Sequence, residues 1–168
     1  MGIIEIKDAV AARQMLQKLL PIVSSAEDWH KNEGASVTLT FTYKGLEKIG
    51  VPQESLDTFP ESFKEGMAER SRFLYDIGVN DPKNWEKVFR RSHIHIAAAI
   101  IANNEEAWKS KLEEFRSKLT NNSGVEVIMS HDFAVSEEVK NVFGFRDGIS
   151  NPEIEGSGIA VSYTHLTL

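Results

Sequence analysis

The stretch NVFGFRDGISNPEIEGSG, which covers residues 141–158, contains the residue types best suited to proton chemistry. Phe143 and Phe145 lie beside Arg146-Asp147, so an aromatic pair flanks a loop carboxylate. Partial burial beside apolar rings raises the pKa of a carboxyl group and lets it exchange protons near neutrality. Asp147-Gly148 is also a common turn dipeptide. A proton-transfer site and an ordinary surface loop are therefore the two interpretations of this stretch.

The histidines are the residues that could bind a metal. His93 and His95 are two apart in an apolar run, so a strand would point them to the same face and offer two ligands. A third ligand is needed, and the chain has no cysteine. His131 could approach, but no pattern requires it to do so. We therefore interpret these histidines as ordinary strand residues and predict no metal site among them.

Composition excludes several classes of protein. The chain has 168 residues, a net charge of −6 and no cysteine, which rules out disulfides and cysteine nucleophiles. The acidic balance argues against binding nucleic acid or an anionic membrane, and the strand expected over residues 93–101 carries no stacking aromatic. No apolar run approaches membrane-spanning length, and the start, MGIIEIKDAVAAR, does not have the pattern of a secretory signal. We expect a cytoplasmic protein.

The first part of the chain predicts a strand, a helix and a second strand. Residues 3–6 are β-branched, and Asp8 can cap the helix that follows. Pro21 ends or kinks that helix. Alternation predicts a half-buried strand over residues 37–43. The apolar positions at helical spacing are Ala9, Ala12, Leu16, Leu19, Leu20 and Val23.

The later part predicts a second set of the same elements. After Gly45 comes a long stretch rich in glycine and proline, with a helix around residues 61–70 and loops elsewhere. A central strand is expected over residues 93–101, and a further strand over 125–130. The intervening helix begins after Asn103 or Asn104 and has a buried stripe of Trp108, Leu112, Phe115 and Leu119.

The order of these elements is β-α-β, insertion, β-α-β. This order predicts an α+β protein of the ferredoxin-like class, in which an antiparallel βαββαβ sheet carries its helices on one face. The insertion adds a helical and loop segment. Because many unrelated functions use this fold, the fold by itself names none of them.

The motif Gly144-Phe145-Arg146-Asp147-Gly148 matches the Gly-x-x-Asp-Gly signature of the dye-decolourising peroxidases. The continuation through Pro152 also resembles that family, as do FTYKGLEKIGVP and SFKEGMAERSRFLYDIGVNDPKNW. Together these segments make residues 3–158 similar to the N-terminal half of the family.

The resemblance implies a haem peroxidase built from two ferredoxin-like domains, with haem b held mainly by the second. Asp147 resembles the distal acid–base group, which moves a proton between the oxygens of hydrogen peroxide. Gly148, Ile149 and Ser150 would lie along the haem edge as cofactor-binding residues. The second substrate would be a reducing aromatic compound such as a dye or a phenol.

The resemblance also implies what this chain lacks. In the family, the axial histidine of the iron and the distal arginine lie further along, in a second domain that is missing here. We therefore expect the chain alone to be inactive. The expected divisions are a ferredoxin-like domain over residues 1–135, a distal haem-pocket loop over 136–160, and a non-native tail over 161–168.

A second interpretation needs no catalysis. A lone ferredoxin-like module could bind a protein partner or form a homo-oligomer through its sheet edge or through the face that carries Thr38, Thr40 and Thr42. Haem binding and turnover by the chain would exclude this interpretation.

Overall fold

The computed structural model describes residues 1–25, 34–90, 93–119 and 124–133. The chain divides into two compact units, of which the first comprises residues 1–23 and 34–131. The second comprises residues 24–33 and 132–168. All helices and strands given below belong to the first unit.

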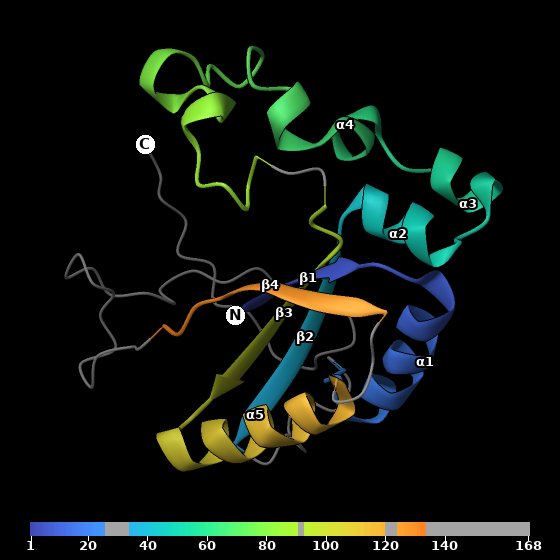
Figure 1. Cartoon of the computed structure of the whole chain (residues 1–168), viewed down its shortest axis with the longest axis vertical. Helices are drawn as coiled ribbons and strands as arrows, with labels where there is room; N and C mark the ends of the chain where they lie inside the picture. The colour runs from blue at the N-terminus through green and yellow to red at the C-terminus, as the bar shows by residue number, and fades with distance from the viewer. Residues whose placement is uncertain (26–33, 91–92, 120–123, 134–168) are drawn as a thin grey trace, which may run out of the picture. The chain divides into compact units, whose positions relative to one another are not determined.

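The first unit is built on a four-stranded antiparallel sheet with the strand order β2-β3-β1-β4 (Figure 1). This arrangement confirms the predicted ferredoxin-like α+β fold. β1 is central and pairs with β3 on one side and β4 on the other, while β2 lies at an edge. The strands are β1 (Gly2–Ile6), β2 (Ala35–Phe41), β3 (Ile96–Ala102) and β4 (Val125–Ser130).

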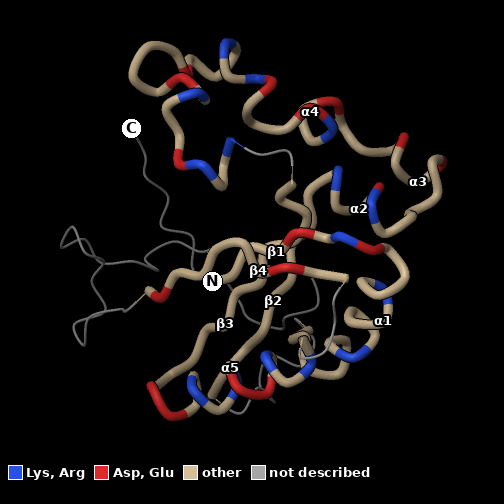
Figure 2. Tube along the Cα trace, in the orientation of Figure 1, with Lys and Arg blue, Asp and Glu red and all other residues tan. Residues whose placement is uncertain are grey.

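Two helices, α1 (Ala9–Leu19) and α5 (Glu105–Leu119), share one hydrophobic core with the sheet. Removing these apolar side chains from water is the main favourable contribution to folding. Figure 2 shows that charged residues lie mainly on the helices and loops, whereas β2 and β3 carry none. The buried core consists of Ile4, Ile6, Ala12, Met15, Leu19, Val37, Ile96, Ala98 and Phe115.

The first helix begins as predicted, because the Asp8 carboxylate accepts a hydrogen bond of 2.8 Å from the Ala11 N–H. Pro21 lies in a short 3₁₀ helix, η1 (Leu20–Ile22), which follows α1. The predicted apolar stripe is partly wrong: Leu20 is 72% exposed, whereas Met15 is fully buried. Leu20 keeps helical geometry and bonds to the Leu16 carbonyl, so its exposure shows that it lies off the buried face of the helix.

The second strand is shorter than predicted, and two unpredicted helices follow it. β2 ends at Phe41, and Thr42 caps α2 (Tyr43–Ile49), so Tyr43 is helical rather than a strand residue. Gly50 ends α2 in the left-handed conformation, with φ +84°, which glycine adopts without steric cost. The second unpredicted helix is α3 (Gln53–Asp57).

The predicted helix around residues 61–70 is present as α4 (Glu61–Glu69). Gly66 interrupts it with φ +76°. The chain then makes two short 3₁₀ helices, η3 (Gly78–Asn80) and η4 (Pro82–Asn84), before it returns to the sheet. We call residues 42–95, which connect β2 to β3, the inserted segment.

The last predicted helix and the last predicted strand are both present, as α5 and β4. The Asn104 side chain accepts a hydrogen bond of 2.8 Å from the Ala107 N–H and so caps α5. Of the predicted stripe on α5, only Phe115 is fully buried. In β4 the pairing shifts between Ile3 and Ile4 of the neighbouring strand, which breaks the simple alternation expected for residues 125–130.

Candidate functional site

The residues predicted to carry the chemistry lie outside the described part of the structure. They are Asp147, Gly148, Ile149 and Ser150, and the divisions proposed at residues 136–160 and 161–168 also fall there. Their roles therefore stay predictions. The described residues show a different group of interacting polar side chains, at the end of the sheet where the inserted segment leaves and returns.

The two ends of the inserted segment are hydrogen-bonded to each other. The Thr42 hydroxyl donates to the Ile94 carbonyl at 2.7 Å and accepts from the Gly45 N–H at 3.0 Å. The Thr42 N–H donates to the His95 carbonyl at 3.1 Å. One threonine thus caps α2 and ties the start of the inserted segment to its end.

His95 connects the same junction to the central strand. Its side chain is buried, and its Nδ1 accepts a hydrogen bond of 2.8 Å from the Ile6 N–H. Because Nδ1 is an acceptor here, the neutral ring carries its proton on Nε2. The His95 N–H also donates to the Ile4 carbonyl at 3.2 Å. Burial lowers the pKa of His95 from its ordinary value, and the nearby Glu5 carboxylate opposes that effect.

Glu5 is the buried carboxylate of this group. Its side chain is 11% exposed and lies 2.8 Å from the Lys7 Nζ and 3.4 Å from the His93 Nδ1. Lys7 also contacts Glu126 of β4 at 3.1 Å. The hydrogen bond from Lys7 is the main reason that the pKa of Glu5 lies below its usual value, while burial opposes the shift. A paired carboxylate of this kind is satisfied and stabilises the end of the sheet.

His93 and His95 precede β3, which begins at Ile96, so the prediction that they are strand residues is wrong. His95 Nδ1 is engaged by the Ile6 N–H, and His93 Nδ1 faces Glu5. Within the described ranges, no three His, Cys, Asp or Glu side chains are arranged to hold a metal ion. In the same part of the chain, no helix is long and apolar enough to cross a membrane.

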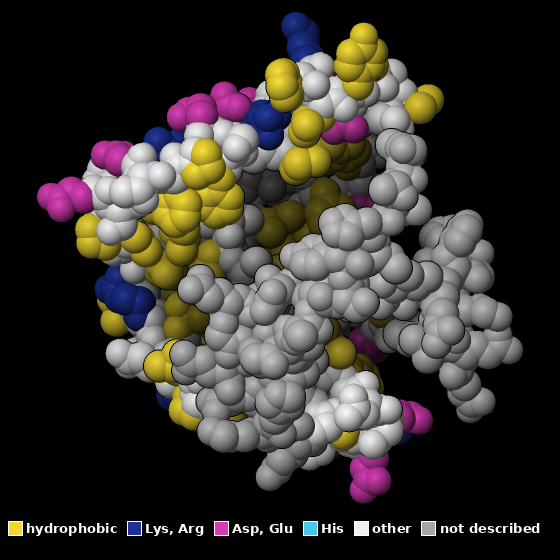
Figure 3. Space-filling view, turned by 180° about the vertical axis from the view of Figure 1, so that it is seen from behind, with side chains coloured by type: hydrophobic (Ala, Val, Ile, Leu, Met, Phe, Trp, Pro, Cys, Tyr) yellow, Lys and Arg dark blue, Asp and Glu magenta, His cyan; other side chains and the backbone are white. Residues whose placement is uncertain are grey.

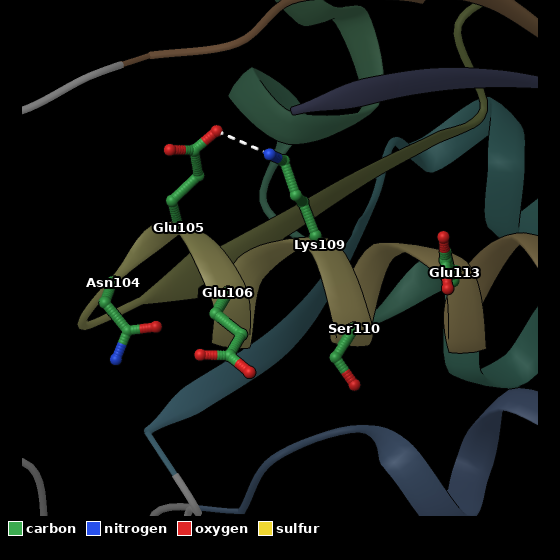
Figure 4. A pocket seen from close by; sticks show the side chains of 6 residues that line it. All are labelled: Asn104, Glu105, Glu106, Lys109, Ser110 and Glu113. Atoms are coloured by element: carbon green, nitrogen blue, oxygen red, sulfur yellow. Dashed lines mark ion pairs between the residues drawn. The ribbon is translucent and has the colours of Figure 1, made fainter.

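A shallow pocket lies along the beginning of α5 (Figure 4). Its side chains are solvent-facing, and Lys109 pairs with Glu105 at 2.7 Å. Acidic groups in the first turn of a helix are stabilised by the helix dipole, which accounts for their position without a ligand. The lining residues are Asn104, Glu105, Glu106, Lys109, Ser110 and Glu113.

The inserted segment exposes an unusual amount of apolar surface. Figure 3 shows hydrophobic side chains protruding from this part of the molecule. Phe73 and Tyr75 are each 79% exposed and Val79 is 87% exposed. Tyr75 has φ +63°, a conformation that costs energy for a bulky residue. Arg70 stacks over the Phe73 ring at 5.1 Å.

Sequence reasoning did not find the buried polar group at the end of the sheet. Glu5 offered a usable signal, because it is an acidic residue within a β-branched run. Alternation along the strand places its side chain on the opposite face from Ile4 and Ile6, which face the core. The hydrogen bond between Ile6 and His95 joins positions 89 residues apart, so no local pattern predicts it.

The strand order and helix placement define the first unit as a ferredoxin-like α+β domain. Residues 3–135 match the family described as the DyP dimeric alpha+beta barrel domain. The chain belongs to this family, and it is an N-terminal domain of the dye-decolourising peroxidase type.

Individual relatives agree with this assignment. The chain is 26% identical over 161 residues to Peroxidase 2 of Mycetinis scorodonius, which covers 93% of this chain and 31% of that protein. Its fold is similar to that of an ancestral D-type dye decolorizing peroxidase, with 24% identity, a TM-score of 0.75, and coverage of 92% and 36% of the two chains. A decolorizing peroxidase from Auricularia auricula-judae gives 19% identity, a TM-score of 0.72, and coverage of 95% and 35%. The chain therefore spans about a third of the length of these relatives.

Dye-decolourising peroxidases are haem enzymes. An iron ligand needs a free imidazole nitrogen or another donor facing an open site. His95 is buried and engaged through Nδ1, and His93 lies against Glu5. The Nδ1 atoms of both histidines are therefore engaged within the first unit, and neither side chain fits the ligand of a haem iron.

Proposed function

We propose that this chain is the N-terminal part of a haem-dependent peroxidase that uses hydrogen peroxide to oxidise dyes, phenols or similar aromatic donors. The observation that carries the proposal is the family match over residues 3–135. The Gly-x-x-Asp-Gly motif at residues 144–148 follows the matched region directly and supports it. Haem b is the cofactor proposed for the longer enzyme, with its iron ligand in the C-terminal domain.

In this proposal Asp147 is the distal acid–base group. Cleavage of the O–O bond of hydrogen peroxide is assisted when a proton moves from one oxygen to the other. A carboxylate within hydrogen-bonding reach would accept the proton from the first oxygen and return it to the second, which leaves as water, while bound haem would supply the two electrons that cleavage requires and retain the first oxygen. Phe143 and Phe145 would limit the access of water to this carboxylate. Gly148, Ile149 and Ser150 are proposed to lie along the haem edge, where small side chains and backbone N–H groups permit close approach.

The test of Asp147 uses the longer enzyme with haem bound. Replacing Asp147 by Asn removes the proton acceptor with little change in size. We expect haem binding to be kept and the rate of reaction with peroxide to fall by about 10²- to 10⁴-fold, the usual contribution of a general acid–base group. Stopped-flow absorbance after mixing with hydrogen peroxide measures this rate.

A matched control is Asp57→Asn, which changes an exposed aspartate on α3 and should leave the peroxide rate unchanged. An Asp147→Asn enzyme with wild-type rates across the pH range would remove Asp147 from the mechanism. The peroxidase assignment itself would be lost if the longer protein bound haem but did not oxidise any aromatic donor.

A non-catalytic module that self-associates is the second candidate function. The exposed side chains of Phe73, Tyr75 and Val79 favour it, since contiguous apolar surface on a small protein marks a contact site. β2 is an edge strand, as this interpretation requires, and Thr38 and Thr40 are exposed on it. Thr42 is not part of that face, because it caps α2.

A further inference from the structure

The junction between the sheet and the inserted segment contains one buried group that can change charge in a mildly acidic solution. We infer that His95 forms an acid-sensitive link, defined as the hydrogen bond from the Ile6 N–H to the His95 Nδ1, which holds the inserted segment to β1 and is released when Nδ1 takes up a proton. The inference concerns the first unit alone and does not depend on the proposed peroxidase function.

The geometry of the link allows only one protonation state. The Ile6 N–H points at Nδ1 from 2.8 Å, so the nitrogen must keep its lone pair available. A proton on Nδ1 would place two N–H groups against each other and leave the buried Ile6 N–H without this acceptor. An unsatisfied buried donor is costly, so the protonated ring must move away from β1.

The charged groups around His95 come from three directions. Glu5 and Lys7 lie on and after β1, Lys48 lies on α2, and His93 precedes His95 in the chain. Glu5 favours the charged ring, whereas burial, Lys48, His93 and Lys7 favour the neutral ring. Because burial is the largest of these influences, the pKa of His95 lies below its ordinary value. The link is therefore complete at neutral pH, and it is lost as the pH falls through the lowered pKa of His95.

Release of the link would affect both ends of the inserted segment. Thr42 at its start bonds to the carbonyl groups of Ile94 and His95 at its end. Because these bonds go to the main chain of Ile94 and His95, a shift of that main chain on release of the ring would reach the cap of α2. The Lys7 N–H, in contrast, donates to the Gly124 carbonyl at 2.8 Å and has no bond to this junction. Acid should loosen the junction before it loosens the pairing near Gly124.

The experiment is an NMR titration of the ¹⁵N-labelled 168-residue chain between about pH 7.5 and 4.5. Ring ¹⁵N shifts report the protonation of His95, and hydrogen exchange, corrected for intrinsic rates, reports the protection of the Ile6 N–H. We expect the protection of Ile6 to fall by up to about tenfold per pH unit as the pH approaches the His95 midpoint, and to level off below it. The Lys7 N–H should keep its protection over that range.

The decisive variant is His95→Asn, whose side-chain oxygen can accept from the Ile6 N–H but cannot be protonated in this range. We expect Ile6 protection in this variant to be independent of pH. His93→Asn is the matched control and should keep the pH dependence, because it leaves His95 in place.

Three results would overturn the link. One is an Ile6 N–H that stays protected while the His95 ring titrates. Another is a His95→Asn variant with the same loss of protection as the wild type. The third is simultaneous loss at Ile6 and Lys7, which would mean that the whole unit unfolds together. If His95→Asn does not fold, the first and third results still decide the question, since both are measured on the wild-type chain.

Discussion

Gly45 has no room for a side chain in the junction. A β-carbon at this position would lie 2.1 Å from the His95 carbonyl oxygen, far inside van der Waals contact. The neighbour is backbone, which cannot rotate away as a side chain can. Gly45 is therefore what lets α2 approach the beginning of β3, and this approach allows Thr42 to reach Ile94 and His95.

Replacing Gly45 by Ala should destabilise the chain by about 1–3 kcal/mol or more, the cost of forcing extra volume into a packed site. Urea unfolding followed by circular dichroism measures the free energy of unfolding. The matched control is Gly2→Ala in β1, where the nearest atom to the new β-carbon is 3.9 Å away, and we expect little change there. Equal effects of the two substitutions would show that α2 can shift away from His95 at no cost.

At the residue scale, local contacts could be predicted from the sequence and distant ones could not. Asp8 and Asn104 were expected to cap helices, and each accepts a hydrogen bond from an N–H three residues later. Such bonds depend only on neighbouring residues. The bond between Ile6 and His95 joins positions 89 residues apart, so no local pattern indicates it. The role of Asp147 was inferred from a resemblance and stays a prediction.

The first two helices of the inserted segment are short, and only α2 has a side-chain cap. α2 has seven residues and α3 has five, which is too short for either helix to be stable by itself. Apolar spacing over so few residues gives little signal, and this is why both helices were missed. The alternation of residues 37–43 predicted a strand to Tyr43, but the Thr42 hydroxyl caps α2 and ends the strand sooner.

Removing the cap of α2 should therefore weaken the whole junction. Thr42→Val keeps the shape of the side chain and removes both hydrogen bonds of the hydroxyl, to Ile94 and from Gly45. We expect a loss of about 1–2 kcal/mol in the free energy of unfolding. Thermal unfolding followed by circular dichroism measures this loss. Thr40→Val, at an exposed position of β2, is the control, and a comparable loss there would contradict the capping role.

At the scale of the whole molecule, the feature that needs an explanation is the exposed apolar surface of the inserted segment. Four large apolar side chains between residues 73 and 79 are more than half exposed: Phe73, Tyr75, Ile77 and Val79. The chain spans about a third of its relatives. Surface of this kind lowers its free energy when two copies bury it against each other.

We therefore expect the 168-residue chain to self-associate as its concentration rises, in spite of its net charge of −6. Sedimentation velocity over a range of concentrations measures this. A Phe73→Ser, Val79→Ser double variant should remain monomeric at concentrations where the wild type associates. Leu20→Ser, which changes an exposed leucine on η1, is the control. A wild-type chain that stays monomeric throughout would remove the self-associating module as a function.

The central position of β1 has a consequence for how the protein is made. Gly2–Ile6 is synthesised long before its partners, which are residues 96–98 on one side and 125–130 on the other. The sheet cannot close until almost all of the described chain has been synthesised. During that time β1, the strand with the most buried residues, has no neighbour, and closing such long loops slows folding. The hydrophobic side chains of β1 therefore stay exposed for much of the synthesis of this chain, which is a state prone to aggregation.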